Sequence, residues 1–130
     1  MQTLKLLLVA IGVTFFATAC GAQTAGDSAA AQPVAAATHL IIDFHVAQDR
    51  LNDFLPIMAG INEGMAGEEG FVSADVYRNV DDPLNFTLVE LWESRALHGA
   101  HYDRIVASGD WANILAMLTQ EPRMSYNDKL

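Results

Sequence analysis

Apolar residues occupy every second position from Leu40 to Val46, within a segment that begins at His39. One face carries Leu40, Ile42, Phe44 and Val46, and the other carries Ile41, Asp43 and His45. Side chains of a strand point to opposite faces in turn, so this period of two predicts a strand with one buried face.

The period of the apolar positions changes after Asp49. They now fall three or four residues apart, which is the spacing of one face of an amphipathic helix. The positions are Leu51, Phe54, Leu55, Met58, Ile61 and Met65. Asp49 is a residue type that caps helix N-termini, so we expect the helix to begin there. Pro56 is expected to bend the helix, and Gly64 and Gly67 to end it.

Two further strands are predicted at residues 71–78 and 86–93, joined by a turn at 79–83. By simple alternation, one face of this hairpin carries Val72, Ala74, Val76, Val89 and Leu91, and the other carries Phe71, Tyr77, Phe86, Leu88 and Trp92. An antiparallel sheet can leave one face in water, so two apolar faces call for a cover on each. A partner subunit is the simplest second cover, and we therefore expect a homodimer.

The last third of the chain predicts a second helix and a final strand. Ser94 is expected to cap a helix whose inward stripe is Leu97, His101 and Ile105. Residues 108–110 interrupt this helix, which resumes at Trp111, and residues 123–128 alternate weakly. The order β-α-β-β-α-β is that of an α+β, ferredoxin-like split βαβ fold.

The start of the chain has the pattern of an export signal. Lys5 precedes an uncharged run at residues 6–16, which is shorter than the roughly 20 apolar residues of a membrane span. Small residues follow at 17–19, so residues 1–19 are predicted to be a signal peptide. Cys20 directly after them resembles a bacterial lipoprotein signal, in which this cysteine is lipidated and becomes the mature N-terminus. Ala17 departs from the large aliphatic residue usual in that motif.

That resemblance implies a lipoprotein that faces the periplasm. Gly21, rather than Asp, follows the cysteine, which implies an outer-membrane anchor. Residues 20–37 are small and polar and form a predicted flexible linker, which leaves residues 38–130 as the folded domain. Residues 17–19 also satisfy the rule for ordinary secretory cleavage, so a freely secreted protein is the alternative.

Composition excludes several classes of function. The 130 residues include 7 Lys and Arg against 16 Asp and Glu, a net charge of −9, which argues against binding to nucleic acid. A single cysteine rules out an internal disulfide and a cluster of thiolate ligands. The four histidines show no metal-ligand spacing, so we expect no metal. Contact with a membrane is expected only through a lipid on Cys20.

Four short motifs resemble the antibiotic biosynthesis monooxygenase (ABM) domain. They are Glu-Gly-Phe at 69–71, Asp-Asp-Pro at 81–83, Val-Glu-Leu-Trp-Glu-Ser at 89–94 and Ala-Leu-His-Gly-Ala-His-Tyr at 96–102. The resemblance covers about residues 40–128 and implies a dimeric α+β barrel in which two sheets meet face to face. Some members of the family oxygenate quinols, anthrones or polyketide aromatics without a cofactor, and others cleave haem. Trp111 stands where, in our alignment, the haem-cleaving members have an iron-binding histidine.

The resemblance implies a small aromatic substrate, no cofactor and a catalytic role for His101, which matches a helical histidine of the family. A histidine with an ordinary pKa of about 6.5 accepts a proton at physiological pH. The alternative is a structural histidine bonded to a backbone carbonyl or to Glu90. Trp92 and Trp111 are candidates for stacking on an aromatic substrate, with plain packing as the alternative for Trp92.

Three polar residues of the predicted strands complete the candidates. Asp43 and His45 lie on the more polar face of the first strand and are candidate substrate-binding residues, with exposure to solvent as the alternative. Glu90 would be costly to bury without a partner, so we expect it to bond to a histidine or an arginine in a structural role. A different class of function also fits the fold, namely a non-catalytic module that binds a hydrophobic ligand or a partner protein.

Overall fold

Four strands form one antiparallel sheet in a computed structural model that describes residues 36–130. The predicted signal peptide at 1–19, the lipidation site Cys20 and all but the last two residues of the linker lie outside the described residues. The strands are β1 (Thr38–His45), β2 (Phe71–Arg78), β3 (Asn85–Trp92) and β4 (Arg123–Asn127). Their spatial order is β2-β3-β1-β4, which confirms the α+β ferredoxin-like fold.

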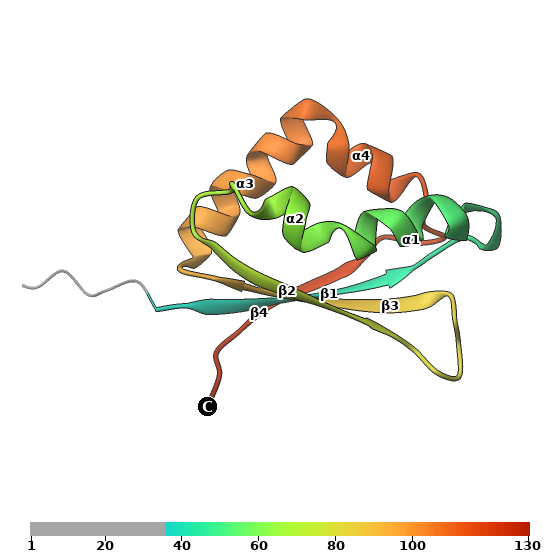
Figure 1. Cartoon of the computed structure of the whole chain (residues 1–130), viewed down its shortest axis with the longest axis horizontal. Helices are drawn as coiled ribbons and strands as arrows, with labels where there is room; N and C mark the ends of the chain where they lie inside the picture. Colours follow the sequence, from blue (N-terminus) through green and yellow to red (C-terminus); the bar gives the residue numbers. More distant parts are fainter. Residues whose placement is uncertain (1–35) are drawn as a thin grey trace, which may run out of the picture. The chain divides into compact units, whose positions relative to one another are not determined.

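All the helices of the described residues lie on one face of this sheet (Figure 1). They are η1 (Gln48–Arg50), α1 (Leu51–Ala59), α2 (Ile61–Met65), α3 (Arg95–Ser108) and α4 (Asp110–Leu115). The core lies between the two layers, where the Phe54 ring of α1 packs 5.4 Å from Phe44 and 5.2 Å from Phe86. Within residues 36–130, no helix is both long enough and apolar enough to cross a membrane.

The first helical segment differs from its prediction. Asp49 does not cap it, because the chain first makes a short 3₁₀ turn in which the Arg50 N–H donates to the Ala47 carbonyl at 2.9 Å. Neither η1 nor α1 has a side-chain cap, and Asp49 lies within the 3₁₀ turn rather than at a helix start. The helix also runs through Pro56 and breaks at Gly60, whose N–H donates to the Pro56 carbonyl at 3.1 Å. One predicted helix is therefore two.

The second helical segment agrees with its prediction. Ser94 caps α3, since its Oγ accepts a hydrogen bond from the Leu97 N–H at 3.2 Å. The helix ends at Gly109, whose φ of 90° lies in the left-handed region that favours glycine. This start and this end place His98 and His101 on the buried side of α3.

The two faces of the β2–β3 hairpin were assigned incorrectly from the sequence. An irregularity between Phe71 and Ser73 shifts the register, so that Ala74 pairs with Glu90 and Val76 pairs with Leu88. Ala74 and Val76 therefore lie on the helix-covered face, whereas Tyr77, which pairs with Thr87, lies on the other. A β-bulge of this kind inserts one residue and reverses the alternation expected beyond it.

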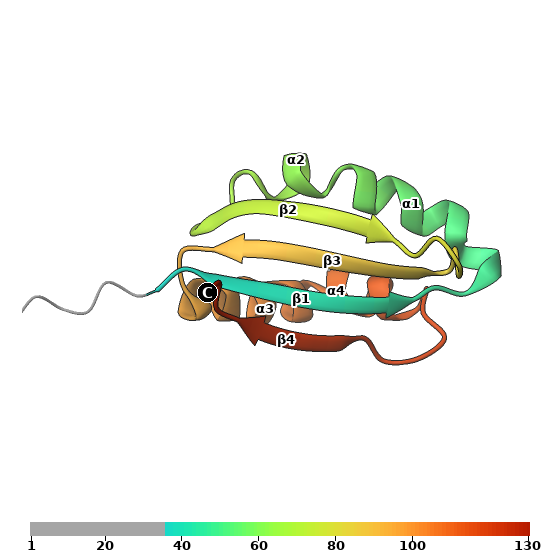
Figure 2. The ribbon, with the colours of Figure 1, turned by 90° about the horizontal axis from the view of Figure 1, so that it is seen from below.

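The face of the sheet turned away from the helices carries apolar as well as polar residues. Figure 2 shows that no helix of the described residues lies over it. Ile41 and Val89 pair across β1 and β3 on this face and remain partly exposed. Tyr77 is 58% exposed. Apolar residues, which led us to expect a partner subunit, are thus present on this face. They differ in part from the set that simple alternation assigned to one face, because the pairing of β2 with β3 is shifted.

The turn between α2 and β2 is pressed against α3 at Gly70. Gly70 has a φ of +79°, and a Cβ added to it would lie 2.8 Å from the Leu97 Cβ. Replacement by alanine therefore meets an unfavourable backbone conformation and a steric clash together.

We predict that Gly70→Ala lowers the free energy of unfolding by about 2 kcal/mol or more, given that the left-handed conformation alone costs roughly 1–2 kcal/mol. Urea unfolding of the purified protein measures this change. Gly67→Ala is the matched control, because a Cβ at Gly67 meets nothing within 4 Å. Equal stabilities of the two variants would contradict the prediction.

Candidate functional site

A cavity of about 460 Å³ lies between the helices and the covered face of the sheet. Its lining is mainly apolar and comes from every layer of the fold. The apolar residues include Ile42, Phe44, Leu88, Ile57, Met58, Ile61, Met65, Ile105, Trp111, Ile114 and Met124. This volume is within the range of roughly 300–1,000 Å³ that small-molecule sites occupy. The broken helices α1/α2 and α3/α4 form its two walls.

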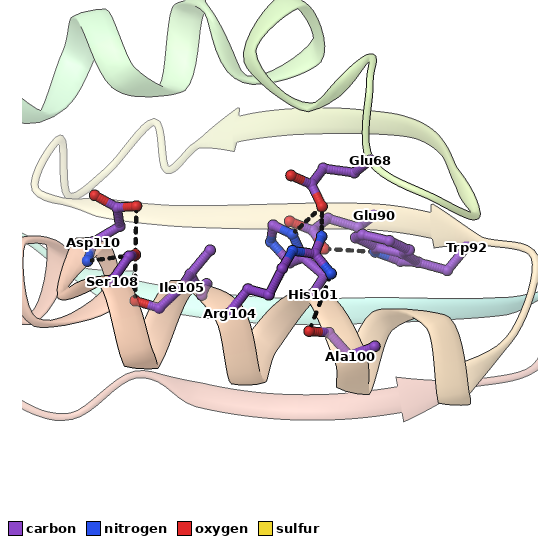
Figure 3. A network of polar contacts seen from close by, with 9 residues as sticks. All are labelled: Glu68, Glu90, Trp92, Ala100, His101, Arg104, Ile105, Ser108 and Asp110. Carbon is purple, nitrogen blue, oxygen red and sulfur yellow. Dashed lines mark hydrogen bonds and ion pairs between the residues drawn. The ribbon is translucent and has the colours of Figure 1, made fainter. Parts of the chain in front are cut away.

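The cavity also has polar lining residues that come from four segments. They are Glu68 of the turn after α2, Glu90 of β3, and His98, His101 and Tyr102 of α3, together with Asp110 and Asn113 of α4. Figure 3 shows Glu68, Glu90 and His101 facing one another from three of these segments. The site thus combines an apolar chamber with one cluster of ionisable side chains.

Glu90 is buried, with 4% of its surface exposed, and its Oε2 accepts a hydrogen bond from the Trp92 indole N–H at 2.8 Å. Residues two apart on a strand share a face, which brings these two side chains together. Burial raises the Glu90 pKa above its ordinary value, while the Trp92 bond and the charge of His101 act in the opposite direction. The prediction that Glu90 bonds to a histidine or an arginine is therefore wrong, and its hydrogen-bond partner is Trp92.

His98 is held in a fixed orientation beside Trp92. Its Nδ1 lies 2.6 Å from the Tyr126 hydroxyl, and its ring packs edge to face on Trp92 with centroids 5.2 Å apart. Burial, with a smaller contribution from the charge of His101, lowers the pKa of His98 to about 4. His98 is therefore neutral at neutral pH.

His101 lies over the same tryptophan, with ring centroids 5.2 Å apart. Its Nδ1 is 3.1 Å from Oε2 of Glu68, and the same carboxylate pairs with Arg104. Burial lowers the pKa of His101 and outweighs the negative charge of Glu90, which acts to raise it. The imidazole is therefore neutral at neutral pH and has one ring nitrogen able to accept a proton.

The structure brings together only some of the residues proposed from the sequence. His101 and Trp111 line the cavity. Trp92 is fully buried and does not line the cavity. Its ring packs against those of His98 and His101, and its indole N–H donates to Glu90.

Asp43 and His45 lie elsewhere. They pair with Thr87 and Asn85 on the face of β1 turned away from the helices, and Asp43 accepts a hydrogen bond from the Thr87 hydroxyl at 2.8 Å. The expectation that they line a pocket does not hold for this cavity, because alternation along β1 directs them to the other side of the sheet.

Six polar lining residues were not proposed as site residues from the sequence, namely Glu68, Glu90, His98, Tyr102, Asp110 and Asn113. Glu90 and His98 each carry a signal in their spacing, since Glu90 is two residues from Trp92 on a strand and His98 is three residues from His101 on a helix. Tyr102 follows His101 and gave no further signal. Glu68 lies in a turn, where periodicity indicates nothing about the direction of a side chain.

The arrangement is suited to proton abstraction from a bound apolar molecule. A neutral imidazole is placed beside a chamber that an aromatic ring fits, and Tyr102 and Trp111 pack edge to face with centroids 5.5 Å apart at its border. General-base catalysis needs a basic group within reach of the proton and an environment that stabilises the resulting anion.

The sequence profile of the family described as antibiotic biosynthesis monooxygenase matches residues 38–104. The chain belongs to the ABM family. The match spans β1 to the middle of α3 and so includes Glu68, Glu90, His98 and His101. No curated protein sequence matches the chain significantly.

Solved structures share the ABM fold with this chain. A conserved protein from Methanosarcina mazei Go1 aligns with a TM-score of 0.64 and 18% identity, over 73% of this chain and 94% of that one. A protein from Mycobacterium tuberculosis gives 0.63 and 19%, over 73% and 96%. SnoaB, a cofactor-independent oxygenase from Streptomyces nogalater, gives 0.61 and 16%, over 74% and 97%. At these identities the likeness shows a common fold.

The lowered pKa of His98 predicts that the protein loses stability in mild acid. The unfolded chain takes up a proton near pH 6.5 and the folded chain only near pH 4, so the contribution is present above 6.5 and is lost as the pH falls through this window. Between pH 7 and pH 5 the loss from His98 alone is about 2 kcal/mol.

Urea unfolding at the two pH values, compared between the wild type and His98→Gln, isolates this loss. The variant is expected to lose less stability on acidification, although the raised pKa of Glu90 acts against the loss in both proteins. An imidazole of His98 that titrates near 6.5 in the folded protein would contradict the prediction.

Proposed function

We propose that this ABM-family protein is a cofactor-independent monooxygenase that acts on a small electron-rich aromatic such as a quinol or an anthrone. The observation that carries the proposal is the position of His101, a buried neutral imidazole at the edge of an apolar chamber. Family membership and the fold shared with the Streptomyces nogalater oxygenase support it.

The lining favours a flat, neutral ligand that carries hydroxyl groups. The apolar walls and Trp111 offer contact to an aromatic ring. At the polar end, Glu68 and Glu90 are hydrogen-bond acceptors when ionised, and the positive charge of Arg104 is paired with Glu68. A phenolic hydroxyl donates to such groups, whereas a carboxylate on the ligand would be repelled by them.

The reaction starts with transfer of the acidic substrate proton to His101. The resulting anion is electron-rich and passes one electron to O2, which gives a substrate radical and superoxide. Their combination forms a carbon–oxygen bond, and proton return from the imidazolium gives a hydroperoxide. In an anthrone, loss of water from the hydroperoxide leaves a carbonyl, so that its CH2 group and O2 become C=O and H2O. The chain contributes binding, the base and a water-poor environment.

Oxygen uptake by the purified protein against reduced quinols and anthrones tests this proposal. We predict that His101→Ala lowers kcat by a factor on the order of 10²–10⁴, the usual contribution of a general base. His45→Ala is the matched control, since it removes a histidine from the opposite face of the sheet and is expected to leave the rate unchanged. Because the pKa of His101 is lowered, uptake is expected to persist at pH 6.

Equal rates for His101→Ala and the wild type would remove His101 from the mechanism. Binding of these aromatics without any oxygen uptake would overturn the enzymatic proposal. It would favour a non-catalytic ABM module that binds a hydrophobic ligand, which the size and apolar lining of the cavity also support.

We propose that the uncovered sheet face joins a second copy of this chain. The partly exposed Ile41 and Val89 on this face support the proposal, because a sheet face that stays in contact with solvent usually carries polar residues. Sedimentation of the purified protein is expected to give a dimer at micromolar concentration, and Val89→Lys a monomer that keeps its fold. A wild-type monomer would refute the proposal.

We also propose that the domain is tethered to a membrane through a lipid on Cys20, with a freely secreted form as the alternative. The small residues that precede this cysteine and the linker that follows support a tether. Mass spectrometry of the mature N-terminus decides between the two forms, since an unmodified Cys20 would exclude the anchor.

A further inference from the structure

We propose that Glu68 positions the His101 base by accepting its Nδ1–H, which leaves Nε2 as the nitrogen that takes the substrate proton. The geometric part of this inference stands on the contacts of Glu68. Its catalytic consequence rests on the function proposed above.

The contact between the two side chains is short and lies at a buried atom. His101 Nδ1 is 3.1 Å from Oε2 of Glu68, and the His101 side chain is 10% exposed. Within residues 36–130, no aligned hydrogen bond reaches this nitrogen. A buried ring nitrogen without a partner is costly, and Glu68 is the acceptor in reach. Catalytic hydrogen bonds are often poorly aligned before a ligand binds and tighten when it does.

The Glu68 carboxylate is held in place by Arg104, which pairs with the same oxygen, Oε2. Arg104 is three residues after His101 on α3, so both side chains reach the turn after α2 from one side of the helix (Figure 3). The Arg104 Nη1 also donates to the Ala100 carbonyl at 3.2 Å. An adjacent guanidinium favours the ionised form of a carboxyl, and an ionised carboxylate only accepts hydrogen bonds.

The backbone at Glu68 is fixed as well. The Glu68 N–H donates to the Met65 carbonyl at 3.0 Å, and its carbonyl accepts from the Phe71 N–H at 3.2 Å. Two residues on, the Gly70 carbonyl accepts from the Glu93 N–H at 2.8 Å, which ties the turn to the end of β3. The carboxylate therefore extends from a rigid turn and not from a loose loop.

The other ionisable groups that face His101 already have partners. Glu90, from β3, accepts the Trp92 N–H, and His98, on α3 itself, contacts the Tyr126 hydroxyl through Nδ1. Neither is in hydrogen-bond contact with Nδ1 of His101. A neutral imidazole carries one proton, and the hydrogen bond made by one nitrogen decides which nitrogen carries it. Glu68 therefore selects the tautomer with the proton on Nδ1.

Nitrogen-15 NMR of the full chain labelled at histidine reads this tautomer directly and needs no substrate. The signals of His101 are assigned as those present in the wild-type spectrum at pH 7.5 and missing from the spectrum of His101→Ala. We expect Nδ1 of wild-type His101 to carry the proton. Glu68→Ala is expected to move the proton largely to Nε2, whereas Glu68→Gln, which keeps an acceptor oxygen, preserves the wild-type pattern.

Two controls separate positioning from general damage to the fold. Glu69→Ala changes the exposed neighbour of Glu68 and is expected to leave the tautomer unchanged. Arg104→Gln breaks the ion pair but keeps the acceptor, so the proton is expected to remain mostly on Nδ1. A wild-type proton on Nε2, or a tautomer that Glu68→Ala does not alter while the fold persists, would overturn the inference.

The oxygen-uptake assay then connects the tautomer to the reaction. Glu68→Ala is expected to lower kcat by a factor on the order of 10², with little change in KM, because the substrate still binds while the base presents a protonated nitrogen. Uptake that depends on His101 but not on Glu68 would overturn the positioning role and leave the function standing. If NMR gives the expected tautomer but no oxygen uptake is found, the proposed function fails and the contact between Glu68 and His101 stands.

Discussion

The hydrogen bond from the Trp92 indole to the Glu90 carboxylate is the interaction on which the site depends. It is 2.8 Å long and lies in the interior, where an isolated carboxylate would be costly. Because the two residues lie two apart on one face of β3, the strand backbone sets their relative position. The indole is then the surface on which His98 and His101 rest, each with ring centroids 5.2 Å from Trp92. Trp92 thus donates a hydrogen bond to Glu90 and packs against both His98 and His101.

The cavity beside this cluster follows from the way in which the helices are broken. Gly60 separates α1 from α2, and Gly109, with a φ of 90°, separates α3 from α4. Each wall of the cavity is therefore bent, and apolar side chains line the space between them. The same apolar surroundings that suit an aromatic ligand also penalise a charged imidazole, which lowers the pKa of both histidines. The proposed preference for an aromatic ligand and the lowered pKa of the two histidines therefore have the same physical cause.

Sequence patterns predicted the parts of the fold in which one local rule decides. The alternation from 39 to 46 gave β1, Ser94 gave the start of α3, and the inward stripe of α3 gave His101 a buried place. The predictions that failed depended on backbone detail. A bulge after Phe71 reversed the faces of β2, and a 3₁₀ turn that includes Asp49 precedes α1, so Asp49 does not cap a helix. The role of Glu68 could not be predicted, because periodicity does not indicate where the side chain of a turn residue points. Its proximity to His101 is seen only in the folded chain.

The most direct test of this account is a crystal structure of the protein with a hydroxyanthraquinone, the oxidised form of an anthrone. The account predicts that the rings lie in the cavity between the two bent walls, against Trp111, with a ligand oxygen within hydrogen-bond distance of His101. A ligand on the uncovered face of the sheet, near Asp43 and His45, with the cavity unoccupied, would contradict it.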